Sequence, residues 1–227
     1  MKRVILTSVL FFIGLGFVSA QGYEEYGFPQ DSTSSANAEW SDDWLVGGGI
    51  GLSTLLYHGN TPRLSEALEI NVTKLVTPAI AFRFGAQGFR GHETFTPYFY
   101  QHSPLPYDPS TNEVSWDYFY LHFDLMWNLT NAIRGYDPDR HLDVLPYLHG
   151  GYQRMFDPKA FSTNYDREVV CGAGVLATYR VGDNLHITAD LRDGNFSSRF
   201  HDYREGGRAN LLTATFGILY SIPCRAE

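Results

Sequence analysis

Cysteine and positive charge are both scarce in this 227-residue chain. Its 17 Lys and Arg stand against 25 Asp and Glu, and the net charge of −8 argues against nucleic-acid binding, which needs a basic surface. The two cysteines, Cys171 and Cys224, could pair in an oxidising compartment. The strand topology predicted below places them at opposite ends of a barrel, so we expect no disulfide.

Long hydrophobic runs are also lacking. The N-terminal apolar stretch is too short for a spanning helix, which needs ~20 apolar residues, and no later segment reaches that length. Any membrane insertion would therefore use β-strands, because only helices and closed barrels satisfy their backbone groups in lipid.

The N-terminus carries processing signals. A basic start, an apolar core and the small-residue site Val18-Ser19-Ala20 predict a signal peptide cleaved before Gln21. The polar, serine-rich stretch that follows predicts a flexible leader. The expected segments are a signal peptide (1–20), a leader (21–43), a barrel (44–222) and a tail (223–227).

Period-two alternation of apolar and polar residues dominates the rest of the chain. It is clearest in Phe119–Leu129 and resumes over Leu142–Tyr152. Such alternation marks a strand with one apolar and one wet face, and a membrane-spanning strand of ~9–11 residues explains it better than a soluble sheet. The other segments that alternate are Trp44–Tyr57, Glu66–Val76, Ile80–Phe89, Val169–Val181, Leu185–Arg192 and Ala209–Tyr220.

The pattern predicts an all-β fold, a transmembrane antiparallel up-and-down barrel of about eight strands. Short turns at 77–78 and 182–184 alternate with long loops at 91–114, 156–167 and 193–207. Because such barrels have short periplasmic turns and long outer loops, we expect both termini on the periplasmic side. The connection at 131–141 is longer than usual for a turn.

The inward positions of the predicted barrel carry many charged side chains. An eight-stranded barrel is about wide enough for its own side chains, so buried charges there must be paired. We expect a salt-bridged, plugged lumen, in which Arg180 lies near His186 and His122 near His149; the alternative is a narrow proton or small-ion path. The lumen set is Glu69, Arg83, His122, Asp124, His149, Arg180, His186, Asp190 and Arg192.

Aromatic residues gather in the longest loop, where rigid rings could stack on glycans or dock a partner protein. The alternative is that these rings pack on one another or lie at the headgroup level. The candidates are Phe95, Tyr98, Phe99, Tyr100 and Tyr107.

Catalysis is weakly supported. His102-Ser103, or His201 with Asp202 near Ser197 and Ser198, lie in predicted loops without the spacing of a catalytic triad. We expect no enzymatic activity, no cofactor and no metal site.

The hairpin around residue 130 also resembles a family. A strand ending Asn-Leu-x-Asn leads through Gly-Tyr-x-Pro-x-Arg to a strand with Pro-Tyr, as in the small outer-membrane barrels of Bacteroidetes related to the OmpA N-terminal domain. The match rests on Asn128, Leu129, Asn131, Gly135, Tyr136, Pro138, Arg140, Pro146 and Tyr147. We expect no counterpart of the peptidoglycan-binding domain of OmpA, and the last predicted strand does not end on a terminal aromatic.

The resemblance implies an integral outer-membrane protein of a Gram-negative cell with a structural or interaction role. Its expected partners are outer-membrane lipid and an envelope protein or surface glycan. The alternatives are a porin-like channel for small solutes or ions and a lipid A-modifying enzyme.

Overall fold

The computed structural model describes residues 44–56, 62–94, 107–108, 113–137, 139–156, 167–197 and 208–222. The predicted signal peptide, leader and C-terminal tail lie outside these residues. The described strands are β1 (Trp44–Leu56), β2 (Leu64–Leu75), β3 (Ile80–Thr94), β4 (Tyr107–Asp108), β5 (Glu113–Trp127), β6 (Leu142–Phe156), β7 (Arg167–Arg180), β8 (Leu185–Ser197) and β9 (Arg208–Ile222).

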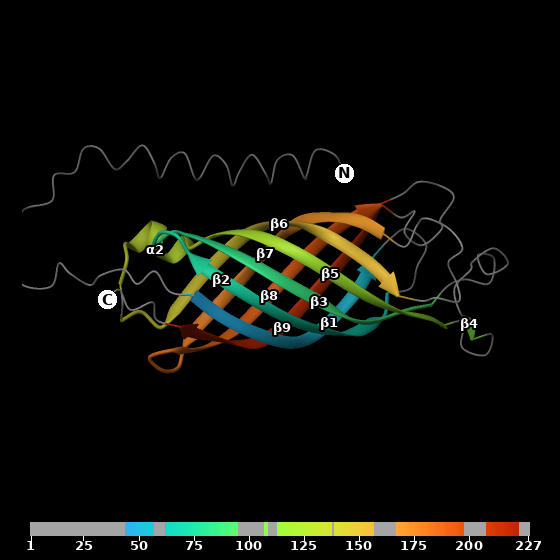
Figure 1. Ribbon diagram of the computed structural model, residues 1–227, viewed down its shortest axis with the longest axis horizontal. Coiled ribbons are helices and arrows are strands. Elements are labelled where there is room, and N and C mark those ends of the chain that lie inside the picture. The colour runs from blue at the N-terminus through green and yellow to red at the C-terminus, as the bar shows by residue number, and fades with distance from the viewer. Residues whose placement is uncertain are drawn as a thin grey trace, which may run out of the picture. The chain divides into compact units, whose positions relative to one another are not determined.

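Eight of these strands close into a barrel (Figure 1). Each pairs antiparallel with its neighbour in the order β3-β2-β1-β9-β8-β7-β6-β5, and a long ladder between β3 and β5 completes the ring. The two-residue β4 only extends the edge of β5. The predicted up-and-down barrel is confirmed.

The two ends of the barrel differ (Figure 1). One, which we call the turn end, carries the short connections at 76–79 and 181–184 together with the helix α2 (Leu129–Arg134). The other, which we call the loop end, carries β4 and the long connections.

Several strands run further toward the loop end than predicted. The ladder of β3 continues to Thr94 rather than ending at Phe89, and β8 continues to Ser197 rather than Arg192. The predicted loops at 91–114 and 193–207 are correspondingly too long. Outward residues here are polar, as at Arg90 and Asp193, so the hydrophobic alternation fades although the backbone ladder persists.

The prediction that a strand runs through Leu129 was wrong. The strand β5 ends at Trp127, and the Asn128 side chain accepts a hydrogen bond of 2.9 Å from the backbone N–H of Asn131, which caps α2. Gly135, at φ 77°, ends the helix in a conformation that suits glycine. A capped helical turn thus accounts for the unusual length of this connection. No helix in the described part of the chain is long and apolar enough to cross a membrane.

Side chains tie α2 to its surroundings. Asn131 Nδ2 donates to the carbonyl of Pro78 in the neighbouring turn at 2.7 Å. Arg140 donates to Asn131 Oδ1 at 2.6 Å and to the Gly135 carbonyl at 3.1 Å. Four residues of the family-like motif therefore build this end of the barrel: Asn128, Asn131, Gly135 and Arg140.

An apolar layer fills the lumen near the turn end. Its centre is Met126, fully buried and packed among residues from six other positions around the wall. The sequence pattern did not predict this layer, because inward positions were expected to be polar. Its members are Leu45, Ala81, Met126, Leu145, Tyr147, Leu176 and Leu219.

We expect Asn131→Ala to lower the free energy of unfolding by roughly 1–3 kcal/mol, because it leaves the Pro78 carbonyl and the Arg140 guanidinium without this shared partner. Urea unfolding in lipid vesicles measures the change. Arg134→Ala, an exposed substitution on the same helix, is the control and should stay within about 0.5 kcal/mol of the wild type. Equal losses in the two variants would contradict the bracing role of Asn131.

Candidate functional site

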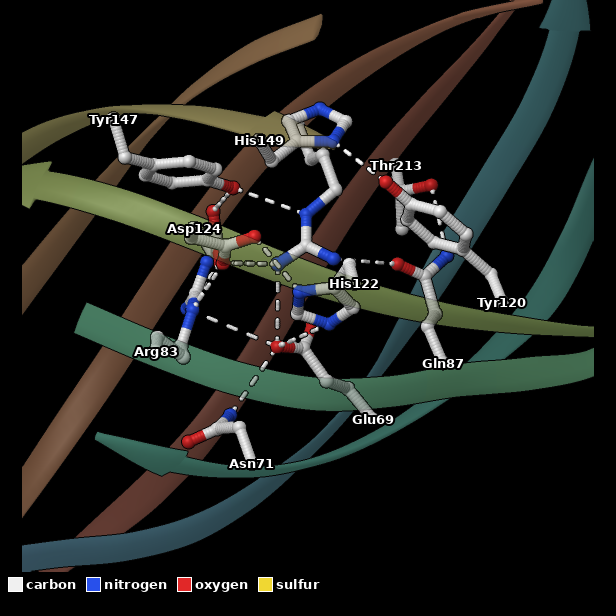
Figure 2. A network of polar contacts seen from close by, with 12 residues as sticks. Glu69, Asn71, Arg83, Gln87, Tyr120, His122, Asp124, Tyr147, His149 and Thr213 are labelled. Atoms are coloured by element: carbon white, nitrogen blue, oxygen red, sulfur yellow. Dashed lines mark hydrogen bonds and ion pairs between the residues drawn. The ribbon is translucent and has the colours of Figure 1, made fainter. Parts of the chain in front are cut away.

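A cluster of charged side chains lies in the middle of the lumen (Figure 2). Arg83 projects inward from β3 and is 1% exposed. Its Nε lies 2.5 Å from Asp124 Oδ2, and its Nη1 lies 2.8 Å from Asp190 Oδ2 and 3.7 Å from Glu69 Oε1. One guanidinium thus bridges carboxylates from β2, β5 and β8.

A second guanidinium shares the same three carboxylates. Arg192 Nη2 lies 3.2 Å from Asp124 Oδ2, 3.4 Å from Glu69 Oε1 and 3.7 Å from Asp190 Oδ2. The interleaved signs offset the repulsion between the two arginines. A buried ion that loses its partners strongly destabilises a protein. The cluster therefore ties together the four strands that supply it, β2, β3, β5 and β8.

Two histidines extend the cluster. His122 Nδ1 lies 2.8 Å from Asp124 Oδ1, and its Nε2 lies 3.8 Å from Glu69 Oε1. His149 is hydrogen-bonded through Nδ1 to the Tyr120 hydroxyl at 2.7 Å, and its Nε2 lies 3.0 Å from the Asp193 carbonyl. The two rings come from neighbouring strands, but each bonds to its own partner.

Tyr147 is a central member of the cluster that the sequence analysis named only as part of the family-like motif. Its hydroxyl donates to Asp190 Oδ1 at 2.6 Å and accepts from Arg192 Nε at 3.2 Å. The ring centroid lies 4.7 Å from Cζ of Arg83 and 5.6 Å from Cζ of Arg192. One aromatic side chain thus touches both guanidiniums, with favourable cation–π geometry.

Gln87 carries the network toward the loop end. Its side-chain nitrogen donates to the Thr213 hydroxyl at 3.2 Å and to the Tyr118 hydroxyl at 3.3 Å. Its oxygen accepts from Arg192 Nη1 at 3.5 Å. The lumen set predicted from the sequence did not include Gln87, Tyr118 or Thr213.

Glycines on neighbouring strands make room for the lumen rings. Gly85 is the cross-strand partner of His122, and Gly174 that of Tyr147. A Cβ at Gly85 would lie 2.5 Å from His122 Nε2, and one at Gly174 would overlap the Tyr147 ring. An inward glycine opposite an inward ring is a sequence signal that could have located these close contacts.

A small cavity adjoins the cluster, with room for about one water molecule. Its lining combines polar and apolar residues: Gly48, Gly49, Glu69, Asn71, Arg83, Leu176, Thr188, Asp190, Thr215 and Leu219. Two polar atoms beside it, Arg83 Nη2 and Asn71 Oδ1, are buried without a hydrogen-bond partner. The site therefore combines tight ion pairing with a little polar space.

The remaining predicted residues fall into two groups. Arg180 and His186 are cross-strand partners, as expected, but they lie half-buried at the turn end, apart from the cluster. The loop aromatics Phe95, Tyr98, Phe99 and Tyr100, and the candidate catalytic residues other than Ser197, lie outside the described residues. Of Tyr107 the structure describes only the backbone pairing in β4. Among the described residues, no group of three His, Cys, Asp or Glu is arranged to hold a metal ion.

The outside of the barrel is apolar. Outward side chains are largely exposed, as at Ile70 (69%) and Phe216 (68%), on every strand of the ring. Aromatic residues cluster near the turn end: Trp44, Tyr179 and Tyr220 are about half exposed, and the ammonium group of Lys74 lies 5.0 Å from the Trp44 ring. An apolar belt edged by aromatic rings is the surface of a barrel that faces lipid.

Comparison with a curated protein agrees with this surface. Over 169 residues the chain is 23% identical to outer membrane protein 41 of Porphyromonas gingivalis, covering 72% of this chain and 40% of that protein. The protein is an outer-membrane β-barrel. It spans less than half the length of that relative. The predicted location and the resemblance to small OmpA-like barrels are confirmed.

One solved structure supports the assignment of the fold. The crystal structure of Neisserial surface protein A matches with a TM-score of 0.53 and 9% identity, over 79% of this chain and 97% of that one. Ail of Yersinia pestis, solved with the heparin analogue sucrose octasulfate, matches with a TM-score of 0.48 and 9% identity, over 81% and 100% of the two chains. No family model matches the sequence.

Removing one lumen arginine should destabilise the barrel strongly. We expect Arg83→Met to lower the free energy of unfolding by roughly 3–5 kcal/mol, because it leaves buried carboxylates under-compensated. Arg90→Met is the matched control: its ion pair with Asp117 spans 3.1 Å with both side chains 55% exposed, and such pairs contribute about 0–1 kcal/mol. Similar losses, measured by urea unfolding in vesicles, would contradict the central role of the cluster. If Arg83→Met fails to fold, Arg83→Lys, which keeps the charge, should restore a folded barrel of intermediate stability.

Proposed function

We propose that this barrel has a structural or interaction role in the cell envelope, with a lumen that does not conduct ions. The observation that carries the proposal is the shared cluster of Arg83 and Arg192 with three carboxylates across the lumen. An open pore would need these ion pairs to separate inside the barrel, at the cost of leaving buried charges unpaired. The apolar layer around Met126 opposes ion passage at a second level.

The interaction surface is proposed to be the loop end. Barrels of this class have short periplasmic turns and longer outer loops, which favours an orientation with α2 in the periplasm and the long connections outside. The aromatic set from Phe95 to Tyr107 remains the candidate contact with a glycan or a partner protein.

A narrow small-solute or ion channel is the second candidate function. The observation in its favour is polar space beside the cluster: the cavity next to Glu69 and the buried His122 Nε2, which has no hydrogen-bond partner. Water entering there could weaken the ion pairs by raising the local dielectric constant.

We propose no enzymatic role. Lipid modification by a serine–histidine pair would need the two side chains within hydrogen-bond reach. Among the described side chains, His122 bonds to Asp124 and His149 to Tyr120 rather than to a serine.

Conductance in planar bilayers tests the closed lumen. We expect the refolded protein to be electrically silent, with heat-modifiable gel mobility as the measure of folding. Steady openings that change size in His122→Ala, but not in the outward-facing control Arg90→Ala, would overturn the proposal and establish a channel. Openings that are unaffected by either variant would point to current outside the lumen.

A further inference from the structure

A carboxylate lies on the outer, lipid-facing wall of the barrel. Asp193 of β8 is exposed, whereas Arg192, its neighbour along the strand, is buried in the lumen. Because side chains alternate along a strand, Asp193 projects outward. Its backbone carbonyl is hydrogen-bonded to His149, but no hydrogen bond or ion pair joins its carboxylate to the residues that the structure describes. The described part of the chain therefore leaves this negative charge uncompensated.

The carboxylate lies below the edge of the apolar belt. Asp193 is eight residues along β8 from Leu185, the first residue of the strand at the turn end. Leu185 pairs with Tyr220, one of the aromatic residues at that end. At a rise of ~3.3 Å per residue and a tilt of ~45°, this separation spans ~19 Å of membrane thickness. The apolar belt of an outer-membrane barrel is ~25 Å tall, so Asp193 lies about 6 Å below its edge at the loop end.

The neighbouring strands agree with this depth. Ala173 of β7 is a cross-strand partner of Asp193, and Val169, four residues nearer the loop end on β7, is 72% exposed. On the other side the partner of Asp193 is Leu212 of β9. The apolar surface thus continues past the carboxylate toward the loop end. An ionisable side chain inside such a surface is costly, which makes it a candidate binding site.

Two amide side chains adjoin the carboxylate. Asn195 follows two residues further along β8, and its cross-strand partner is Asn210 of β9. Both project outward, because their strand neighbours Phe196 and Ala209 are buried. Asn195 Nδ2 donates to Asn210 Oδ1, and this bond leaves each amide with further donor and acceptor capacity. We call Asp193, Asn195 and Asn210 the β8–β9 polar patch.

The carboxylate of the patch requires hydrogen-bond donors. An ionised carboxylate only accepts hydrogen bonds, and it repels a lipid phosphate. At this depth a glycerophospholipid presents ester carbonyls, which are also acceptors. An amino-sugar lipid with amide-linked hydroxyacyl chains presents amide N–H groups at the headgroup edge and acyl hydroxyl groups just below it. Both groups are donors, and a hydrogen bond to an ionised acceptor is stronger than one between neutral groups.

We propose that the β8–β9 polar patch binds an amide-linked hydroxyacyl lipid of the lipid A type in the leaflet at the loop end. An acyl hydroxyl donates to the Asp193 carboxylate, and the amide and sugar groups bond to the Asn195–Asn210 pair nearer the headgroups. The acyl chains lie against Val169 and Leu212 beside the patch. Placing this leaflet on the outside of the cell rests on the orientation in the proposed function.

Native mass spectrometry of the full chain in nanodiscs tests the site. The discs contain phosphatidylcholine with a small fraction of dephosphorylated lipid A, so that retention reports on amide and hydroxyl groups and not on phosphate. We expect lipid A to be retained over phosphatidylcholine, and Asp193→Leu to lower this retention about tenfold, because it removes the charge-assisted contact. Asp183→Leu, the same substitution in the turn before β8, is the matched control and should keep the wild-type preference.

Urea unfolding in vesicles gives a second readout that does not depend on retention in the gas phase. In phosphatidylcholine alone we expect Asp193→Leu to unfold at a higher urea concentration than the wild type, because it removes a lipid-facing carboxylate. Dephosphorylated lipid A should raise the midpoint of the wild type and leave that of Asp193→Leu unchanged, since a ligand stabilises only the protein that binds it.

Three outcomes would overturn the site. Equal retention by the wild type and Asp193→Leu would exclude the carboxylate as a contact, and an equal loss in Asp183→Leu would mean that net charge alone decides retention. Sphingomyelin has an amide N–H and a hydroxyl beneath the same headgroup as phosphatidylcholine. Its retention in preference to lipid A would assign the patch to a sphingoid lipid instead. None of these results changes the conductance of the lumen, so failure of the site is distinct from failure of the proposed function.

Discussion

Closure of the β-sheet is the constraint on which this protein depends. In lipid every backbone N–H and C=O must bond within the chain, and an open sheet edge would leave a row of them unpaired. The ladder between β3 and β5 removes that edge. Once eight strands close, the width of the lumen is set, and the interior has about the volume that its own side chains fill.

The interior is filled by two layers with different chemistry. The apolar layer around Met126 needs only close packing, whereas the charged layer needs each guanidinium to reach several carboxylates. Tyr147 belongs to both, since its ring packs with the apolar residues and its hydroxyl bonds to Asp190. Such a filled, bonded core supports the proposal that the lumen is closed to ions.

The turn end shows how a resemblance in sequence becomes structure. Asn128 caps α2, Asn131 reaches across to the neighbouring turn, and Arg140 bonds back to both Asn131 and Gly135. The connection is therefore a helical turn held by side-chain hydrogen bonds, in place of the short β-turn that is usual at this end of such a barrel. The motif therefore carries information on the architecture of this end, which explains why it indicates a family of barrels and no ligand.

Alternation along the sequence determined the strands, their inward and outward faces, and the location in a membrane, because side-chain direction in a strand has a local period of two. Which charges meet was decided only by the tertiary structure. Arg83 and Asp124 lie 41 residues apart in sequence, and Arg192 and Glu69 lie 123 apart. Such contacts depend on the register of every strand pair and on the closure of the barrel. No pattern within a short stretch of sequence records either of them. The helix α2 escaped prediction for the opposite reason: six residues are too few to show a helical period, and only the cap at Asn128 marks its start.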